Sequence, residues 1–202
     1  MILETVCVGM MQVNCYILAC AEGSPAIIID PGSEAHKIKR ILQRHKLRPG
    51  LVVNTHGHYD HIGGDDKFDV VVYAHNKDLP MLGDPRLNLS GLFALSYEVG
   101  SEIRALEDKE RITLEGIELE VIHVPGHTPG GIALLLKEPK DKILFSGDTL
   151  FCRGVGRTDL AGGDQELLMK SIRERLFTLP PDTVIYPGHG PFSTIGEEKK
   201  HF

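Results

Sequence analysis

Four short apolar segments of this chain each run into a histidine or an aspartate, in a turn marked by glycine or proline. The segments are residues 51–54, 117–124, 142–145 and 183–186, and the polar residues that follow them are His56, His127, Asp148 and His189. Short apolar and β-branched runs bounded by such turns predict buried strands. Since rigid strands commonly present functional side chains on the loops at their ends, we expect these four side chains to converge on one rim of the fold.

The other segments predict a layered α/β fold. The first thirty residues are predicted to form strands, most clearly at 14–18 and 26–29, and a helix over 34–45, a strand at 70–73 and a short helix over 75–82 follow. The second half adds a strand at 132–136 and a helix over 165–177. This order predicts two β-sheets packed together with helices outside, in one domain over residues 1–202.

Residues 83–100 have no clear periodicity. They carry proline, glycine, serine and asparagine between the two strand-rich halves. We predict an irregular segment that crosses the surface, and we regard it as a candidate lid over a site.

Charge and hydropathy argue against several classes of partner. The formal net charge is −6 and no basic run is longer than Lys199-Lys200, so we expect no nucleic-acid partner. No segment approaches the roughly 20 apolar residues of a membrane span, so we expect no membrane partner. The N-terminus has no basic region and Glu4 interrupts its apolar residues, which argues against a signal peptide.

The cysteine pattern also argues against an exported protein. Cys7, Cys15, Cys20 and Cys152 form no C-x-x-C pair, and we interpret them as free thiols in a reducing cytoplasm. We therefore expect a cytoplasmic protein. Its oligomeric state is left open by the sequence.

The run His56-Gly57-His58-Tyr59-Asp60-His61 concentrates side chains that bind metals. Imidazole and carboxylate groups are suitable ligands for zinc, iron or manganese. Alternate residues of an extended segment point the same way, so His56 and His58 can reach one ion, while Asp60 and His61 turn toward a second. Asp148 supplies a carboxylate, which can bridge two cations. A purely structural role for this run is disfavoured, because its imidazoles would repel one another when charged.

The other histidines have simpler interpretations. Isolated histidines are usually surface or packing residues, and we interpret His36, His45, His75 and His201 in this way. His123 precedes His127 by four residues within a predicted strand. We expect it to pack in the core or to hold a ligand ring by a hydrogen bond, rather than to bind a metal itself.

The motifs taken together resemble the metallo-β-lactamase superfamily. Residues 55–64 resemble its T-H-x-H-x-D-H signature, and residues 125–130, 146–149 and 187–190 match its later motifs in order. The resemblance implies an αββα sandwich with two metal ions. It assigns His56, His58 and His127 to one ion and Asp60, His61 and His189 to the other, with Asp148 bridging both. Asp30 and His123 are candidates for holding the ligand rings by hydrogen bonds.

Within that superfamily the chain looks most like the short bacterial glyoxalase II-like proteins, through residues 154–159 and 187–194. This resemblance implies a thioesterase that hydrolyses hydroxyacyl-glutathione-type thioesters through a hydroxide that bridges two divalent ions. Zinc is the first candidate for the metal, and iron and manganese are alternatives. Asp60 would orient the nucleophile. Arg153 or Arg157 would bind a carboxylate of this small-molecule substrate.

The chain departs from full-length glyoxalase II enzymes in two places. Only 13 residues follow His189, so the helical region that supplies basic contacts to glutathione is not in this sequence. Arg157 and Asp159 stand where those enzymes usually have a lysine and a tyrosine, and an internal salt bridge between the two is an alternative role for Arg157. The identity of the thiol therefore stays open.

Two other functions remain as hypotheses. A sulfur dioxygenase of similar fold would use a single iron, held by His58, His127 and Asp148 or their neighbours. A non-catalytic metal-binding protein is the third candidate, which the open ligand positions disfavour. We do not expect β-lactam hydrolysis, because such enzymes are typically exported and this chain has no export signal. Metal stoichiometry separates the first two hypotheses.

Overall fold

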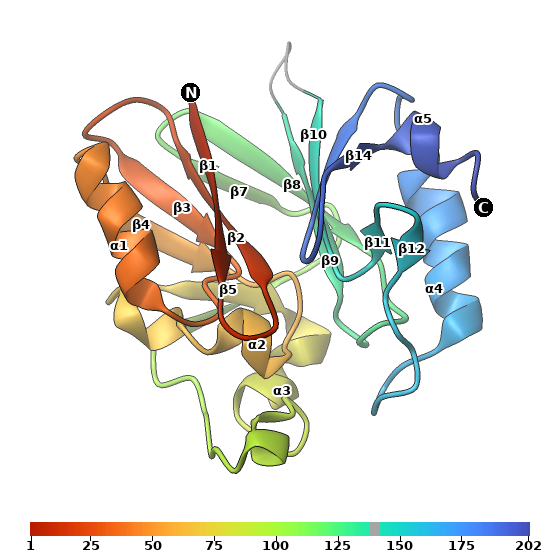
Figure 1. Ribbon diagram of the computed structural model, residues 1–202, viewed down its shortest axis with the longest axis horizontal. Helices are drawn as coiled ribbons and strands as arrows, with labels where there is room; N and C mark the ends of the chain where they lie inside the picture. Colours follow the sequence, from red (N-terminus) through yellow and green to blue (C-terminus); the bar gives the residue numbers. More distant parts are fainter. Residues whose placement is uncertain (138–141) are drawn as a thin grey trace.

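Two six-stranded β-sheets lie face to face, with helices on their outer sides (Figure 1). The computed structural model describes residues 1–137 and 142–202. The first sheet contains β1 (Ile2–Val8), β2 (Val13–Ala19), β3 (Pro25–Ile29), β4 (Arg48–Val53), β5 (Val72–His75) and β6 (Ile103–Leu106), in that order. The second has the order β14 (Ser193–Thr194), β13 (Val184–Pro187), β10 (Ile143–Gly147), β9 (Ile132–Leu136), β8 (Ile117–His123) and β7 (Arg111–Leu114). The predicted αββα sandwich is confirmed.

The helices are short, apart from one on each outer face. They are α1 (Ala35–Arg44), α2 (Tyr59–Ile62), α3 (Leu79–Leu82), α4 (Gln165–Ser171) and α5 (Ile195–Glu198). Single turns of 3-10 helix occur at Asp65–Lys67, Asn76–Asp78 and Ser90–Phe93, and β11 (Leu150–Phe151) pairs with β12 (Gly154–Val155) in a small hairpin. The predicted helix over 165–177 is α4 followed by a π-helical turn at Ile172–Leu176. None of the helices in the described residues is long and apolar enough to cross a membrane.

Alternate residues of the central strands face two different apolar layers. All seven residues of β2 are buried. Cys15 and Ile17 join the layer beneath α1, whereas Tyr16 and Leu18 join the layer between the two sheets. A third layer packs α4 against the outer face of the second sheet through Leu168 and other residues. This two-residue alternation places a helix layer on each side of a double sheet.

The strand directions bring the important loops to one end of the sandwich. In the first sheet β3, β4 and β5 are parallel. In the second sheet, β10 is parallel to β13. Strands β8 and β10 are both antiparallel to β9, which lies between them, so β8 runs in the same direction as β10. The carboxyl ends of β4, β8, β10 and β13 are the four strand ends predicted from the sequence to carry ligands. They meet at one rim.

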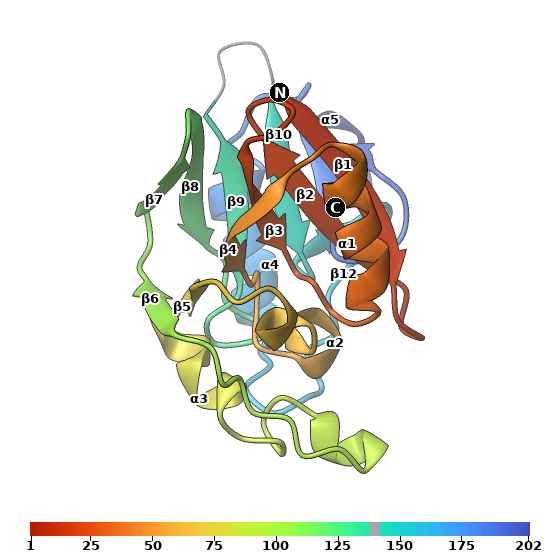
Figure 2. The same cartoon turned by 90° about the vertical axis from the view of Figure 1, so that its left-hand side faces the viewer.

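Edge strands are harder to predict from this sequence. The sequence patterns do not predict β6, because three of its four residues are exposed and no apolar alternation marks it. The segment from 83 to 100 runs along the lower end of the molecule (Figure 2). It contains the helical turn Ser90–Phe93, and Asp66 anchors its end by accepting hydrogen bonds from the N–H groups of Gly100 and Ser101.

Candidate metal centre

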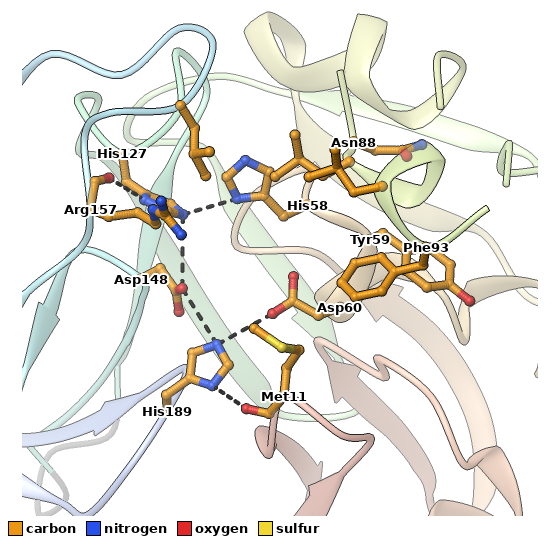
Figure 3. A pocket seen from close by; sticks show the side chains of 13 residues that line it. Met11, His58, Tyr59, Asp60, Asn88, Phe93, His127, Asp148, Arg157 and His189 are labelled. Carbon is orange, nitrogen blue, oxygen red and sulfur yellow. Dashed lines mark hydrogen bonds and ion pairs between the residues drawn. The ribbon is translucent and has the colours of Figure 1, made fainter. Parts of the chain in front are cut away.

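Seven side chains from the loops at the rim point toward one another. Their ligand atoms form three overlapping sets in which the atoms lie within 4.8 Å of one another. These sets are His56, His58 and His127; Asp60, His61 and His189; and His56, His61 and Asp148. Figure 3 shows Asp148 between the side of the cavity that holds His58 and His127 and the side that holds Asp60 and His189. The structure therefore brings together all seven residues that the sequence nominates as ligands.

The first set brings three imidazole nitrogens close to one another. The Nδ1 atom of His58 lies 3.0 Å from Nε2 of His127, while Nδ1 of His127 donates to the carbonyl oxygen of Arg157 at 2.7 Å. That bond fixes the His127 ring and turns its Nε2 toward His58. Burial, helped by the neighbouring His127, lowers the pKa of His58 to about 3. Burial also lowers the pKa of His56, so both rings are neutral, as metal ligation requires.

The second set is held from behind by two acceptors. Nδ1 of His61 lies 3.0 Å from the carboxylate of Asp30, and Nδ1 of His189 lies 3.0 Å from the carbonyl oxygen of Met11. Asp30 is itself fixed by the N–H and hydroxyl groups of Thr55. These contacts turn Nε2 of both histidines inward, where they lie 3.3 Å apart. Asp30 therefore contacts the ring of a candidate metal ligand, His61, on the side away from the other inward nitrogens.

Negative charge accumulates around His61. Burial lowers the pKa of His61, but the carboxylates of Asp148, Asp30 and Asp60 outweigh it and raise the pKa to about 10. These carboxylates therefore favour positive charge at the position that Nε2 faces. A divalent cation there would supply more of that charge than a single proton does.

Asp148 lies between the two sets. Its Oδ1 is 3.4 Å from Nε2 of His61, and its Oδ2 is 3.5 Å from Nε2 of His189 and 3.8 Å from Nε2 of His127. Gly188 permits this approach, because a Cβ atom there would lie 2.2 Å from Oδ1 of Asp148.

Two buried ligand atoms lack a hydrogen-bond partner. They are Nε2 of His56 and Oδ1 of Asp148. Orphaned polar atoms are costly in a protein interior unless something binds them. Together with the donor set of imidazoles and carboxylates, they fit a pair of divalent cations.

The two arginines predicted to bind substrate lie in different surroundings. Arg157 lines the cavity, and its guanidinium also forms a two-point ion pair with Asp159 at 2.8 Å. Arg153 is exposed on the β11–β12 hairpin, where its N–H donates to Glu198, and it is not among the cavity-lining residues that the structure describes. The predicted contact of Arg153 with a substrate carboxylate has no support in its position.

His123 is predicted either to pack in the core or to hold a ligand ring, and its ring contacts groups other than the candidate ligands. Its ring stacks on His75 with centroids 4.0 Å apart, and its Nε2 lies 2.9 Å from the carbonyl oxygen of Pro129. Among the described residues, its hydrogen bonds reach no ligand ring. His123 is the last residue of β8 and stops short of the rim. It therefore supports the loop of His127 by its contact with the carbonyl group of Pro129, and not by a hydrogen bond to the His127 ring.

Asp78 is a site residue that the sequence analysis did not identify. Its buried carboxylate accepts hydrogen bonds from the N–H of Gly57 at 3.0 Å, the hydroxyl of Thr128 at 2.7 Å and the N–H of Gly130 at 2.6 Å. It therefore ties the loop of His56 and His58 to the loop of His127. Burial raises the pKa of Asp78 despite these hydrogen bonds. A single Asp in a short polar segment carries no sequence signal that would separate it from a turn residue.

Asp78→Ala is expected to loosen the connection between the loop of His56 and His58 and the loop of His127. It leaves three donors without their acceptor, and each buried unpaired donor costs about 1–3 kcal/mol. Loss of a group that orients metal ligands typically lowers metal affinity about 10–100-fold. Calorimetric titration of the metal-free protein with zinc measures this change. Asp84→Ala, which removes a half-buried carboxylate paired with the exposed Arg86, is the control, and equal zinc affinity in both variants would contradict this role.

Comparison with known proteins agrees with the geometry. A family model described as the metallo-beta-lactamase superfamily matches residues 8–189 of the chain. The chain belongs to this superfamily. This superfamily member is 38% identical to a probable metallo-hydrolase, YqgX, of Bacillus subtilis over 95% of the chain and 92% of that protein. It is 35% identical to the hydroxyacylglutathione hydrolase GloC of Haemophilus influenzae over 98% of the chain and 95% of that protein.

Solved structures of the superfamily share its fold over nearly the whole chain. The BLEG-1 B3 metallo-beta-lactamase aligns with a TM-score of 0.90 and 37% identity, covering 99% of this chain and 97% of that one. TTHA1623, solved in a di-iron-bound form, aligns with a TM-score of 0.82 and 35% identity, covering 98% of each chain. The His/Asp cluster of this superfamily member is therefore a candidate site for divalent metals whose identity the fold does not fix.

Proposed function

We propose that this superfamily member is a thioester hydrolase acting on hydroxyacyl-glutathione-type thioesters with two divalent ions. The observation that carries the proposal is that both ligand sets open onto one cavity. His58, Asp60, His127, Asp148 and His189 all line this cavity, whose volume is about 190 Å³. Ligands that reach an open space leave room for water and substrate, which is typical of catalytic rather than structural metal sites. The similarity to the hydroxyacylglutathione hydrolase GloC supports the choice of substrate class.

The residues of the chain have separable roles in this reaction. When bound, two divalent cations supply an acidified water and polarise a carbonyl group. His56, His58 and His127 would hold one cation, Asp60, His61 and His189 the other, and Asp148 would contact both. The Asp60 carboxylate lies 3.5 Å from Nε2 of His189 and borders the cavity, a position from which it can orient the attacking water. A thiolate leaves readily, so the reaction needs no strong general acid.

A mononuclear iron dioxygenase is the second candidate. It would need only three of the seven ligands and gives no role to the set of Asp60, His61 and His189. The convergence of two complete sets favours the binuclear hydrolase.

Thiol release tests the proposal. Purified protein loaded with two equivalents of zinc per chain is expected to release glutathione from S-lactoyl-glutathione, measured with a thiol reagent. His58→Ala should slow this release more than about 100-fold, since it removes a ligand and not merely a supporting group. His36→Ala, at an exposed position on α1, is the matched control.

Parallel assays distinguish the alternatives. The same preparation is tested for oxygen uptake with a glutathione persulfide and for opening of a β-lactam ring. Persulfide-dependent oxygen uptake without thioester hydrolysis would replace the proposal by the dioxygenase. Ring opening without thioester hydrolysis would replace it by a β-lactamase activity.

A further inference from the structure

An apolar groove adjoins the metal cavity on the Asp60 side. It lies between the turn that joins β1 to β2 and the segment around Ser90–Phe93, and it has a volume of about 170 Å³. Val8, Met10, Met11, Tyr59, Phe93 and Leu95 contribute its apolar walls. Met10 is 90% exposed, Met11 54% and Phe93 46%. Adjacent exposed apolar side chains of this size usually mark a place where something apolar binds.

The groove and the metal cavity are continuous. Met11, Tyr59, Asp60 and Phe93 line both of them. Figure 3 shows the rings of Tyr59 and Phe93 together on one side of Asp60, with the Met11 side chain beneath that carboxylate. A molecule in the groove would therefore contact Asp60, which is also a candidate metal ligand. The groove is thus best suited to one part of a molecule whose other part is held at the metal centre.

The opposite side of the cavity has a different chemistry. The guanidinium of Arg157 lies beside His127 there, on the side away from Tyr59 and Phe93 (Figure 3). A guanidinium suits a carboxylate of the substrate, even one shared with Asp159. A substrate with one anionic end and one apolar end would thus have a single favourable orientation across the metals.

We propose that the groove binds the acyl group of the substrate, and that this acyl group is apolar and longer than lactoyl. The inference rests on the proposed thioester hydrolysis and specifies its substrate class. The anionic thiol portion lies toward Arg157, and the acyl chain lies between Met11, Phe93 and Leu95. A lactoyl group has one methyl beyond its hydroxyl-bearing carbon, and it leaves most of this groove unfilled.

A matched series of thioesters tests the inference. S-lactoyl-glutathione and S-(2-hydroxyhexanoyl)-glutathione share the thiol, the hydroxyl and the reacting carbonyl, and differ by three methylenes. Burial of each methylene favours binding about fourfold, and the groove is partly open. We therefore expect kcat/KM to be at least about tenfold higher for the hydroxyhexanoyl thioester.

Two variants locate the preference. Leu95→Ser changes a groove residue that is 44% exposed, so folding should survive, and we expect it to lower the hydroxyhexanoyl-to-lactoyl ratio at least threefold. Leu167→Ser removes a leucine of similar exposure, 39%, on α4 outside the groove, and should leave the ratio unchanged.

The outcomes separate this inference from the proposed function. Equal efficiency toward both thioesters in the unmodified protein would overturn the inference and leave thioester hydrolysis standing. A preference that Leu95→Ser leaves intact would also overturn it, because the acyl group would then bind elsewhere. Absence of thiol release from both thioesters would remove the proposed function and the inference with it.

Discussion

Asp148→Asn is expected to lower kcat/KM for thioester hydrolysis more than about 100-fold while the fold is retained. The Asp148 carboxylate lies within 3.4–3.8 Å of inward nitrogens from both ligand sets. An amide has the same shape but one oxygen and no charge, so it cannot balance two cations at once. Groups that merely orient metal ligands contribute about 10–100-fold, and a ligand shared by two ions should contribute more.

The control for this substitution is Asp182→Asn. Asp182 is exposed and pairs with Lys142 at 2.6 Å, on the surface, and surface ion pairs contribute little. Steady-state rates and zinc content are measured for both variants, and circular dichroism checks that both fold. An Asp148→Asn variant that retains two zinc ions and full activity would remove the bridging role.

Chelation of the metals is expected to lower the melting temperature by about 10–20 °C. An ion that binds only the folded chain stabilises it by about 2.7 kcal/mol at a free concentration 100 times its Kd, and two such ions give about 5 kcal/mol. For a domain of this size each kcal/mol shifts the melting temperature by about 2–4 °C. The physical source is the cluster of His61, Asp148, Asp30 and Asp60, in which cations would relieve carboxylate crowding and satisfy buried ligand atoms.

Differential scanning fluorimetry with and without a chelator measures this shift. Asp148→Asn serves as the comparison, since a variant that binds less metal should lose less stability on chelation. Restoring zinc should restore the melting temperature. Identical melting temperatures in the presence and absence of chelator would mean that the histidine cluster holds no stabilising metal.

Four of the seven candidate ligand positions are predictable from sequence because each follows an apolar strand. His56, His127, Asp148 and His189 come one to four residues after strands whose burial is encoded locally, and the carboxyl ends of these strands share one rim. The burial of β2 likewise follows from its apolar composition, whereas the assignment of its alternate residues to two layers follows from strand geometry. The order of the motifs also indicates the superfamily, and the superfamily implies the αββα arrangement.

Other features depend on contacts between distant segments. Asp78 reaches residues 21 and 52 positions away in the chain, so no local pattern reveals it. The apolar groove joins a turn near Met11 to a segment near Phe93, and neither stretch has a helical or strand period. Arg153 and Arg157 are four residues apart, yet of these two only Arg157 lines the cavity, while Arg153 lies at the turn of the β11–β12 hairpin.

The number of metal ions that one chain binds tests the binuclear centre most directly. Metal-free protein is titrated with zinc in a calorimeter, and the metal content of the saturated protein is measured by mass spectrometry. A binuclear centre should bind two ions per chain in the unmodified protein and fewer in Asp148→Asn. Saturation at one ion, or no binding, would contradict the assignment of these seven side chains to a binuclear centre.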